Sequence, residues 1–329
     1  MPRPTKTFES ELNKCLVVID EVLNVEGTPL SARPLNAATL FVKDFVKEIS
    51  GDTKERYYEK PWFAAIFARV LKWYQRKYGQ ALDERNRGFP GAVILHGVPF
   101  AIAVPLTHSE PDVPGETVWC SFEASLGRME RPRSWLERPP SLEALSARES
   151  TRLDRDLAML TKLIRTIHLN LMTASVSARA FDEMRNVALL SLANAARHIC
   201  SATEHSLSLA IWDLSYALEN TMKCLIIQSG KEFSRVHDLS ILLRECARAG
   251  KRPFPKSSLR FLPKGKKIIA HRYGRAMPGG LKATYAAYVA TLQRLVRITE
   301  KLDRRFDFSE ARFLFKRPPW YDDLPEFQT

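Results

Sequence analysis

The stretch HSLSLAIWDLSYALENTMKCLIIQSGK, residues 205–231, decides the fold class of this chain. Its apolar side chains recur every three or four residues, the spacing that places them on one face of an α-helix. Gly230 closes the segment, as glycine often does just after a helix C-terminus. The sequence therefore predicts a long amphipathic helix that buries one face, made of Leu207, Ile211, Leu214, Leu218, Met222 and Leu225.

Four further segments on either side of this helix have the same periodicity. Two precede it, at 153–172 and 180–200, and two follow it, at 237–250 and 279–302. Amphipathic helices joined by short connections favour an up-and-down bundle. We therefore expect the C-terminal half of the chain to be an all-helical bundle.

The N-terminal part mixes two patterns. Helical spacing appears at 8–23, 36–49 and 59–79, and Gly79 is a natural stop for the third helix. Three β-branched, apolar runs then follow between glycines and prolines: GAVILHG, PFAIAVPL and ETVWCSFEA. Runs of this kind predict a short antiparallel hairpin or meander. His96, within the first run, has no second ligand or carboxylate beside it, and we interpret it as structural.

The expected fold class is mainly α, a helical bundle preceded by a smaller α+β domain. Residues 1–127 form that α+β domain, whose role the sequence does not indicate. Residues 128–151 are rich in proline and alternate in charge, which predicts a linker. The bundle follows at 152–305. A tail at 306–329 is rich in aromatic residues, which we expect to fasten it to the rest of the protein.

Positive charge is concentrated in the second half of the chain. Residues 1–150 contain 20 basic and 20 acidic side chains, so residues 151–329 hold the other 30 basic and 17 acidic ones and the whole net charge of +13. Residues 251–275 alone contain nine lysines or arginines and no acid. Such asymmetry favours a polyanionic partner, most often nucleic acid, although a solvated basic loop gives the same pattern.

Several function classes find no support in the sequence. The five cysteines are widely spaced and form no CxxC pair, which argues against a disulfide framework or a thiolate zinc site and favours a cytoplasmic protein. No glycine-rich phosphate loop, HExxH or GxSxG motif occurs. The longest apolar stretch is interrupted by His96, Gly97 and Pro99. We therefore expect no metal, no cofactor and no membrane segment.

Three short motifs together resemble the HEPN family of small helical bundles, over roughly residues 175–305. WDLSYALENTMKCLIIQSGKEF is similar to the second helix of that family and contains Glu219. RVHDLSILL, with His237, is similar to the start of its third helix. GKKIIAHRYG is similar to the segment that reads Arg, a polar residue and then Ile-Ala-His in active members. His271 matches that histidine, and Lys266 stands where active members carry the arginine.

The resemblance implies metal-independent cleavage of RNA by a homodimer formed through the bundle. In the family an arginine and a histidine make the site, because imidazole can transfer protons and a fixed cation stabilises charge on the phosphate. His271 and Lys266 are accordingly the expected catalytic pair. Two further groups are expected around it: the phosphate-binding side chains Lys264, Lys267, Arg272 and Arg275, and the orienting side chains Glu219 and His237.

Alternatives remain open for these residues. His271 is a catalytic residue, a retained residue in a module that no longer cleaves RNA, or a structural histidine. Glu219 orients the site or forms an i,i+4 ion pair with Lys223. If the segment around His271 is helical, Lys267, His271 and Arg275 share one face.

Two functions follow from these alternatives. The first is a metal-independent endoribonuclease, acting as a toxin-like or defence effector on RNA. The second is a catalytically inactive HEPN module that binds RNA or a nucleotide, or that mediates contact with a protein partner. Lysine lacks the planar fork of arginine, and Lys266 therefore favours the second function, whereas the position of His271 favours the first.

Overall fold

The computed structural model describes residues 8–79, 82, 88–113, 116–175, 179–234, 236–250, 259–263, 265–274, 279–308 and 311–316. The chain divides into two compact units. The first comprises residues 1–87, 111–119 and 314–329, and the second comprises residues 88–110 and 120–313. Each has its own hydrophobic core.

The first unit is built on three helices. They are α1 (Phe8–Val25), α2 (Arg33–Leu40), which continues as a π-helical turn over Phe41–Phe45, and α3 (Pro61–Tyr78). Short 3-10 helices lie at Leu30–Ala32 and Tyr57–Glu59. The apolar stripes expected from the sequence meet in the core, where Leu16 of α1 and Val70 of α3 are fully buried. All three N-terminal helices are thus present near their predicted positions.

A buried carboxylate ties these helices together. Asp20 of α1 lies 2.7 Å from Lys77 Nζ and accepts a hydrogen bond of 2.5 Å from the Tyr78 hydroxyl. Arg33 is 3.5 Å away. Although burial alone raises the pKa of a carboxyl, the hydrogen bonds from Lys77 and Tyr78 outweigh it, and the pKa of Asp20 is lowered. Asp20 is therefore charged and paired within the first unit.

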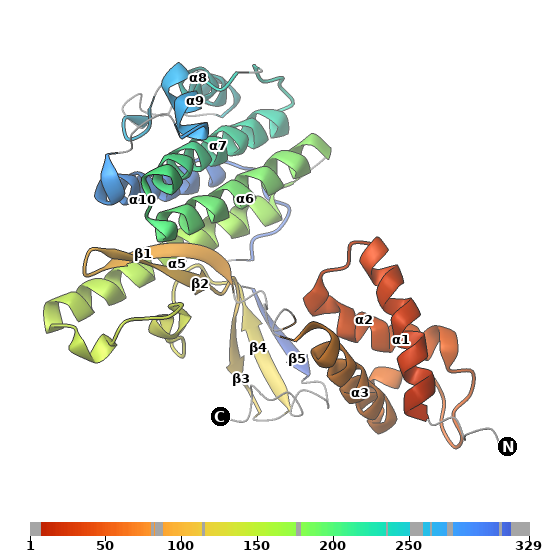
Figure 1. Ribbon diagram of the computed structural model, residues 1–329. Helices are drawn as coiled ribbons and strands as arrows, with labels where there is room; N and C mark the ends of the chain where they lie inside the picture. Colours follow the sequence, from red (N-terminus) through yellow and green to blue (C-terminus); the bar gives the residue numbers. More distant parts are fainter. Residues whose placement is uncertain are drawn as a thin grey trace. The chain divides into compact units, whose positions relative to one another are not determined.

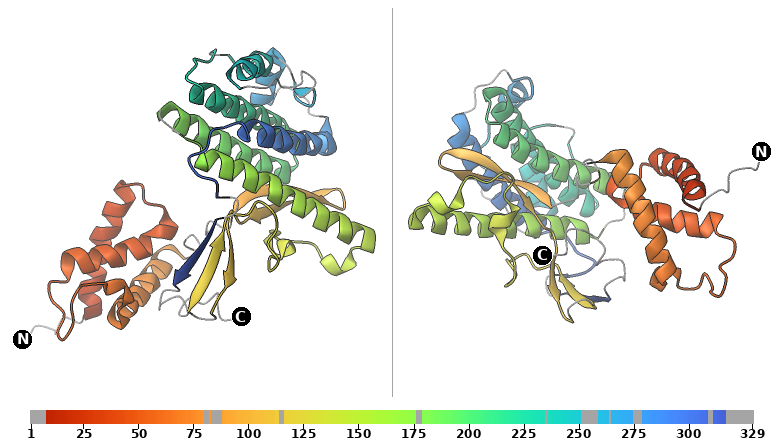
Figure 2. Two further views of the ribbon diagram at one scale, coloured as in Figure 1. Left: turned by 180° about the vertical axis from the view of Figure 1, so that it is seen from behind. Right: turned by 60° about the horizontal axis from the view of Figure 1, so that its bottom comes forward.

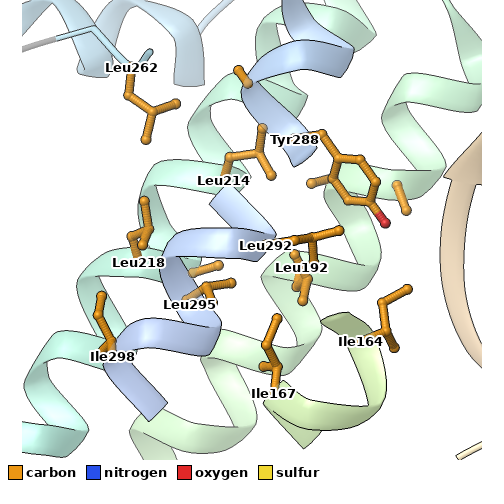
Figure 3. Packing of buried hydrophobic residues seen from close by; sticks show 14 of the residues in the cluster. Ile164, Ile167, Leu192, Leu214, Leu218, Leu262, Tyr288, Leu292, Leu295 and Ile298 are labelled. Carbon is orange, nitrogen blue, oxygen red and sulfur yellow. The ribbon is translucent and has the colours of Figure 1, made fainter. Parts of the chain in front are cut away.

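The second unit is a helical bundle (Figure 1). Its helices are α5 (Ala147–Thr173), α6 (Arg179–Ser201), α7 (Glu204–Gln228), α8 (Leu239–Ala249), α9 (Lys266–Arg272) and α10 (Gly280–Thr299). The quoted stretch forms α7, which packs against α6, α8, α9 and α10. Figure 3 shows Leu214 and Leu218 of α7 facing Leu292, Leu295 and Ile298 of α10. The predicted stripe of α7 is thus the centre of the bundle.

Side-chain caps fix where the helices of the bundle begin. Ser146 and Glu149 form a reciprocal capping box at the start of α5. The Thr203 hydroxyl accepts a hydrogen bond from the backbone N–H of Ser206 at the start of α7. Asp238 Oδ1 accepts hydrogen bonds from two backbone N–H groups at the start of α8. Asp238 thereby caps the N-terminus of α8.

The predicted hairpin is present, but it belongs to the second unit. Strands β1 (Phe89–Leu95) and β2 (Val98–Val104) pair antiparallel around a turn at His96 and Gly97. Both turn residues have positive φ, 49° and 79°, as a tight hairpin turn requires. Figures 1 and 2 show the hairpin lying against α5 and α6. Because its buried residues complete the core of the bundle, the two-unit division does not follow the boundary expected at residue 127.

The segment expected to be a linker, 128–151, is packed into the same unit. It holds short 3-10 helices at Pro132–Trp135 and Leu142–Ala144, and Leu136 is buried. Arg165 of α5 is 2% exposed and forms an ion pair with Glu130. A buried guanidinium needs a carboxylate partner of this kind. The proline content of residues 128–151 gives no indication that the segment supplies one.

Three further strands follow the order β3-β4-β5 in one sheet. They are β3 (His108–Pro111), β4 (Thr117–Ser121) and β5 (Arg312–Lys316). Phe308 and Phe313 of the aromatic-rich tail have ring centroids 5.4 and 5.8 Å from that of Phe122. Residues 317–329 of the expected tail lie outside the described residues.

The fold class agrees with the sequence-based expectation: the protein is mainly helical, with a small α+β part before the bundle. Across the described ranges, no helix combines the length and apolar character needed to span a membrane.

Candidate functional site

The histidine of the GKKIIAHRYG motif lies on α9, which packs against α7. The helix begins after Gly265 and ends at Arg272, and Gly274 turns the chain with φ 63°. Ile268 and His271 are buried, whereas Lys267 and Ile269 are exposed. Lys267 and His271 lie one turn apart on α9, but Lys267 is exposed and His271 is buried. Arg275, which was expected on the same face, lies outside the described residues.

His271 is 5% exposed and is held by a serine of α7. The Ser208 hydroxyl lies 3.1 Å from His271 Nδ1 and 3.2 Å from the carbonyl oxygen of the same residue. Both contacts are satisfied when the hydroxyl donates to the carbonyl and Nδ1–H donates to the hydroxyl. Burial lowers the pKa of His271. The imidazole is therefore neutral at physiological pH.

Arg272 follows His271 and lies over an aromatic ring of α7. Its guanidinium carbon is 5.3 Å from the ring centroid of Trp212 and 5.9 Å from that of Tyr273. Both distances lie within the range of cation–π attraction. Trp212 in turn stacks on Tyr216, at 5.6 Å and an interplanar angle of 19°. Tyr273 is 58% exposed, so this aromatic and cationic group reaches the surface.

The two residues expected to orient the site lie together on the same side of α7. His237 Nδ1 is 3.0 Å from Glu219 Oε2, and Lys223 Nζ is 2.6 Å from Glu219 Oε1. The i,i+4 pair with Lys223 is thus present, but Glu219 is buried rather than solvent-facing. His237 also lies near Trp212, with ring centroids 6.1 Å apart. Glu219 therefore anchors His237 and Lys223.

One face of α7 brings together four of the predicted residues: His271, Arg272, His237 and Glu219. Ser208 holds the first, Trp212 contacts the second and third, and Glu219 itself is the fourth. Lys267 is on α9 but exposed. Lys264, Arg275 and the side chain of Lys266 lie outside the described residues.

Sequence reasoning missed the residues of α7 that receive α9. His205, Ser208 and Trp212 are spaced at i, i+3 and i+7, on the side of the helix away from its apolar stripe. A Cβ built on Gly274 would lie 2.3 Å from Nδ1 of His205. A side chain at position 274 would therefore meet the imidazole of His205 unless that imidazole moved. The sequence signal for these residues is a stripe of polar and aromatic side chains on a different face of α7 from the apolar stripe.

A second histidine–carboxylate pair joins α6 and α7. His198 Nε2 is 3.5 Å from Asp213 Oδ2. Burial raises the pKa of Asp213 to about 7. The pKa of His198 is lowered, first by burial and then by the nearby charges of His205 and Arg197. Because the two shifts bring both groups toward an uncharged state near neutral pH, this pair adds little charge to the bundle.

The site is positively charged and aromatic on its outer side, and its inner side holds an imidazole and an ion-paired carboxylate. Arg272, Lys267 and His237 lie on the outside, whereas His271 and Glu219 are buried. Among the residues with described positions, no three histidine, cysteine or carboxylate side chains are grouped so that they could hold a metal ion. The arrangement is suited to contacts with phosphates and flat rings.

Comparison with protein-family models, curated proteins and solved structures finds no match to the chain.

Proposed function

We propose that the second unit is a HEPN-like module that binds single-stranded RNA on the α7–α9 surface without cleaving it. We define the α7–α9 surface as Trp212, His237, Lys267, Arg272 and Tyr273. The observation that carries the proposal is the guanidinium of Arg272, whose carbon lies 5.3 Å from the ring centroid of Trp212 and 5.9 Å from that of Tyr273.

Single-stranded RNA is bound in general by stacked aromatic rings and guanidinium planes combined with positive charge along the backbone. The α7–α9 surface offers both kinds of contact. Its exposed Lys267 adds a positive charge for the RNA backbone. The basic segment 251–275, to which Lys267 and Arg272 belong, contains nine cations and no carboxylate. A phosphate approaching this surface therefore meets little competing negative charge from the segment itself.

The burial of His271 favours binding over cleavage. A residue that takes a proton from a ribose hydroxyl must come within hydrogen-bond distance of it. His271 is 5% exposed, and its Nδ1 is engaged by Ser208. The geometry favours a structural role for this imidazole, in which it attaches α9 to α7 and so positions Arg272. The homodimer expected from the resemblance to the HEPN family stays a prediction.

Binding can be measured by fluorescence anisotropy with a labelled single-stranded RNA of mixed sequence and the matching duplex. We expect the single strand to bind more tightly and Arg272→Met to weaken binding roughly tenfold, since one stacked base contributes about 1 to 3 kcal/mol. Arg179→Met is the matched control, because Arg179 is a fully exposed arginine at the start of α6. Equal binding of the single-stranded RNA by the Arg272→Met and Arg179→Met variants would contradict the proposal.

Cleavage is tested separately, by incubating the same RNA with the protein in EDTA. We expect intact RNA with the wild type and with His271→Ala alike. Cleavage by the wild type that is lost in His271→Ala would instead support the endoribonuclease hypothesis and overturn the non-catalytic one.

A further inference from the structure

A buried arginine of the bundle, Arg165, follows the rule that a charge removed from water is paired. Arg165 forms an ion pair with Glu130 and donates hydrogen bonds to the carbonyl oxygens of Pro105 and Ser125, at 2.7 and 3.0 Å. Arg185 of α6 is only partly buried, and it lies 3.0 Å from Asp182 although its Nε has no hydrogen-bond partner. Each of these two guanidinium groups thus has a carboxylate beside it.

Arg294 of α10 is the exception. It is 8% exposed, and its Nε and Nη1 atoms are buried without a hydrogen-bond partner. The parts of the chain described by the structure offer this guanidinium neither a hydrogen bond nor an ion pair. Burial, and then the charge of Arg297, lower the pKa of Arg294. An arginine side chain nevertheless keeps its proton at neutral pH, so it cannot relieve the cost of burial by losing its charge. The positive charge therefore stays in place, without a counter-charge among the residues that the structure describes.

A second unpartnered polar group lies on the same side of α10. Thr291 precedes Arg294 by three residues, so the two share a helix face. It is fully buried, and its hydroxyl has no hydrogen-bond partner among the described residues. Most buried hydroxyls in proteins are hydrogen-bonded. The unpartnered guanidinium of Arg294 and the unpartnered hydroxyl of Thr291 lie one helical turn apart, so one small ligand can contact both.

We propose that Arg294 and Thr291 form a binding site for a compact oxyanion, of which inorganic phosphate is the simplest example. The Nε and Nη1 atoms carry three N–H donors between them, and an oxyanion offers several acceptor oxygens. The threonine hydroxyl adds one more donor. The anion supplies the counter-charge that Glu130 and Asp182 supply to the other two arginines. This site does not depend on the α7–α9 surface or on RNA binding.

The proposal is tested by thermal unfolding of the whole chain at constant ionic strength, with phosphate replaced by chloride in the reference buffer. At about five times its dissociation constant, phosphate is expected to raise the Tm of the wild type by roughly 2 to 4 °C. Arg294→Met is expected to lose this shift and Thr291→Val to reduce it. Arg297→Met, which removes an exposed arginine from the same helix, is expected to keep it.

The Arg294→Met variant gives a second readout that needs no ligand. Because an unpaired buried charge is replaced by an apolar chain of similar length, its Tm in chloride is expected to equal or exceed that of the wild type. A fall of several degrees would show that the guanidinium is already paired and would overturn the proposal. So would a phosphate shift that is absent from the wild type or equal in Arg294→Met and Arg297→Met.

Two additional arms identify the source of the anion. A nucleoside monophosphate that raises the Tm more than inorganic phosphate does would assign the site to the phosphate of a nucleotide. Acetate acting as well as phosphate would assign it to carboxylates and contradict the preference for a compact oxyanion with several oxygens. RNA binding by Arg294→Met, measured by anisotropy, is expected to match the wild type, so this proposal and the RNA proposal can fail separately.

Discussion

The Ser208 hydroxyl of α7 contacts both Nδ1 and the carbonyl oxygen of His271, at 3.1 and 3.2 Å, and so joins α7 to α9. Ser208→Ala would leave the buried imidazole Nδ1 without this partner. We expect the free energy of unfolding to fall by about 1 to 3 kcal/mol, as measured by urea denaturation. Ser240→Ala, an exposed serine of α8, is the control and is expected to change little. Equal effects of the two substitutions would contradict the role given to Ser208.

Acid should destabilise the protein through its buried histidines. The pKa of His168 is lowered, first by burial and then by the charge of Arg185, and burial lowers that of His271. The unfolded chain, with a histidine pKa near 6.5, then binds more protons than the folded one. Stability is therefore complete above about pH 6.5 and is lost as the pH falls below it. Urea midpoints at pH 7.5 and 5.0 measure the loss, which His168→Gln should reduce and His96→Gln, at an exposed position, should leave intact.

Asp213 should have the opposite pH dependence. Its folded pKa, raised by burial to about 7, lies above its ordinary value of 3.8. The folded state then binds more protons between these values, so its contribution to stability is lost as the pH rises through them. Asp213→Asn removes a buried group that becomes charged, and we expect it to be more stable than the wild type by roughly 2 kcal/mol at pH 9 but not at pH 4. A pH-independent effect in urea titrations would contradict the shifted carboxyl.

Gly274 should tolerate substitution less well than another glycine with a similar backbone conformation. Gly274 and Gly97 have φ values of 63° and 79°, but only at Gly274 would a new Cβ meet an imidazole, at 2.3 Å. Alanine at either position carries the strain of a left-handed conformation, about 1 kcal/mol. We expect Gly274→Ala to cost at least about 1 kcal/mol more than Gly97→Ala in thermal unfolding. His205→Ala in the same chain should recover much of that difference, and no recovery would show that the contact is unimportant.

Helical spacing predicted the helices of both units because their apolar faces are long and regular. The stripe of α7 and the caps at Gly230 and Asp238 are local features that can be recognised within a few residues of sequence. Helical or strand spacing does not indicate which of the two units a segment belongs to. The hairpin of β1 and β2 follows the N-terminal helices in the chain, yet its apolar residues complete the core of the bundle. Proximity in sequence does not decide which core buries a strand.

The candidate site was predictable in part for the same reason. The motif around His271 and the Glu219 and His237 positions could be identified as short patterns. The partners of those residues could not, since Ser208 and Trp212 are 63 and 60 residues away from His271 and Arg272 in the chain and meet them only when α9 packs on α7. The end of α9 at Arg272 is followed by the turn at Gly274, where φ is 63°.

The ion pair between Arg165 and Glu130 determines where the chain can be cut. A fragment beginning at residue 152, the start suggested by proline content and helical spacing, would keep the guanidinium of α5 but lose Glu130 and the carbonyl oxygens of Pro105 and Ser125. It would also lose the strand residues that cover one side of the bundle. Such a fragment is expected to aggregate on expression, whereas one beginning near Gly88 retains every partner of Arg165.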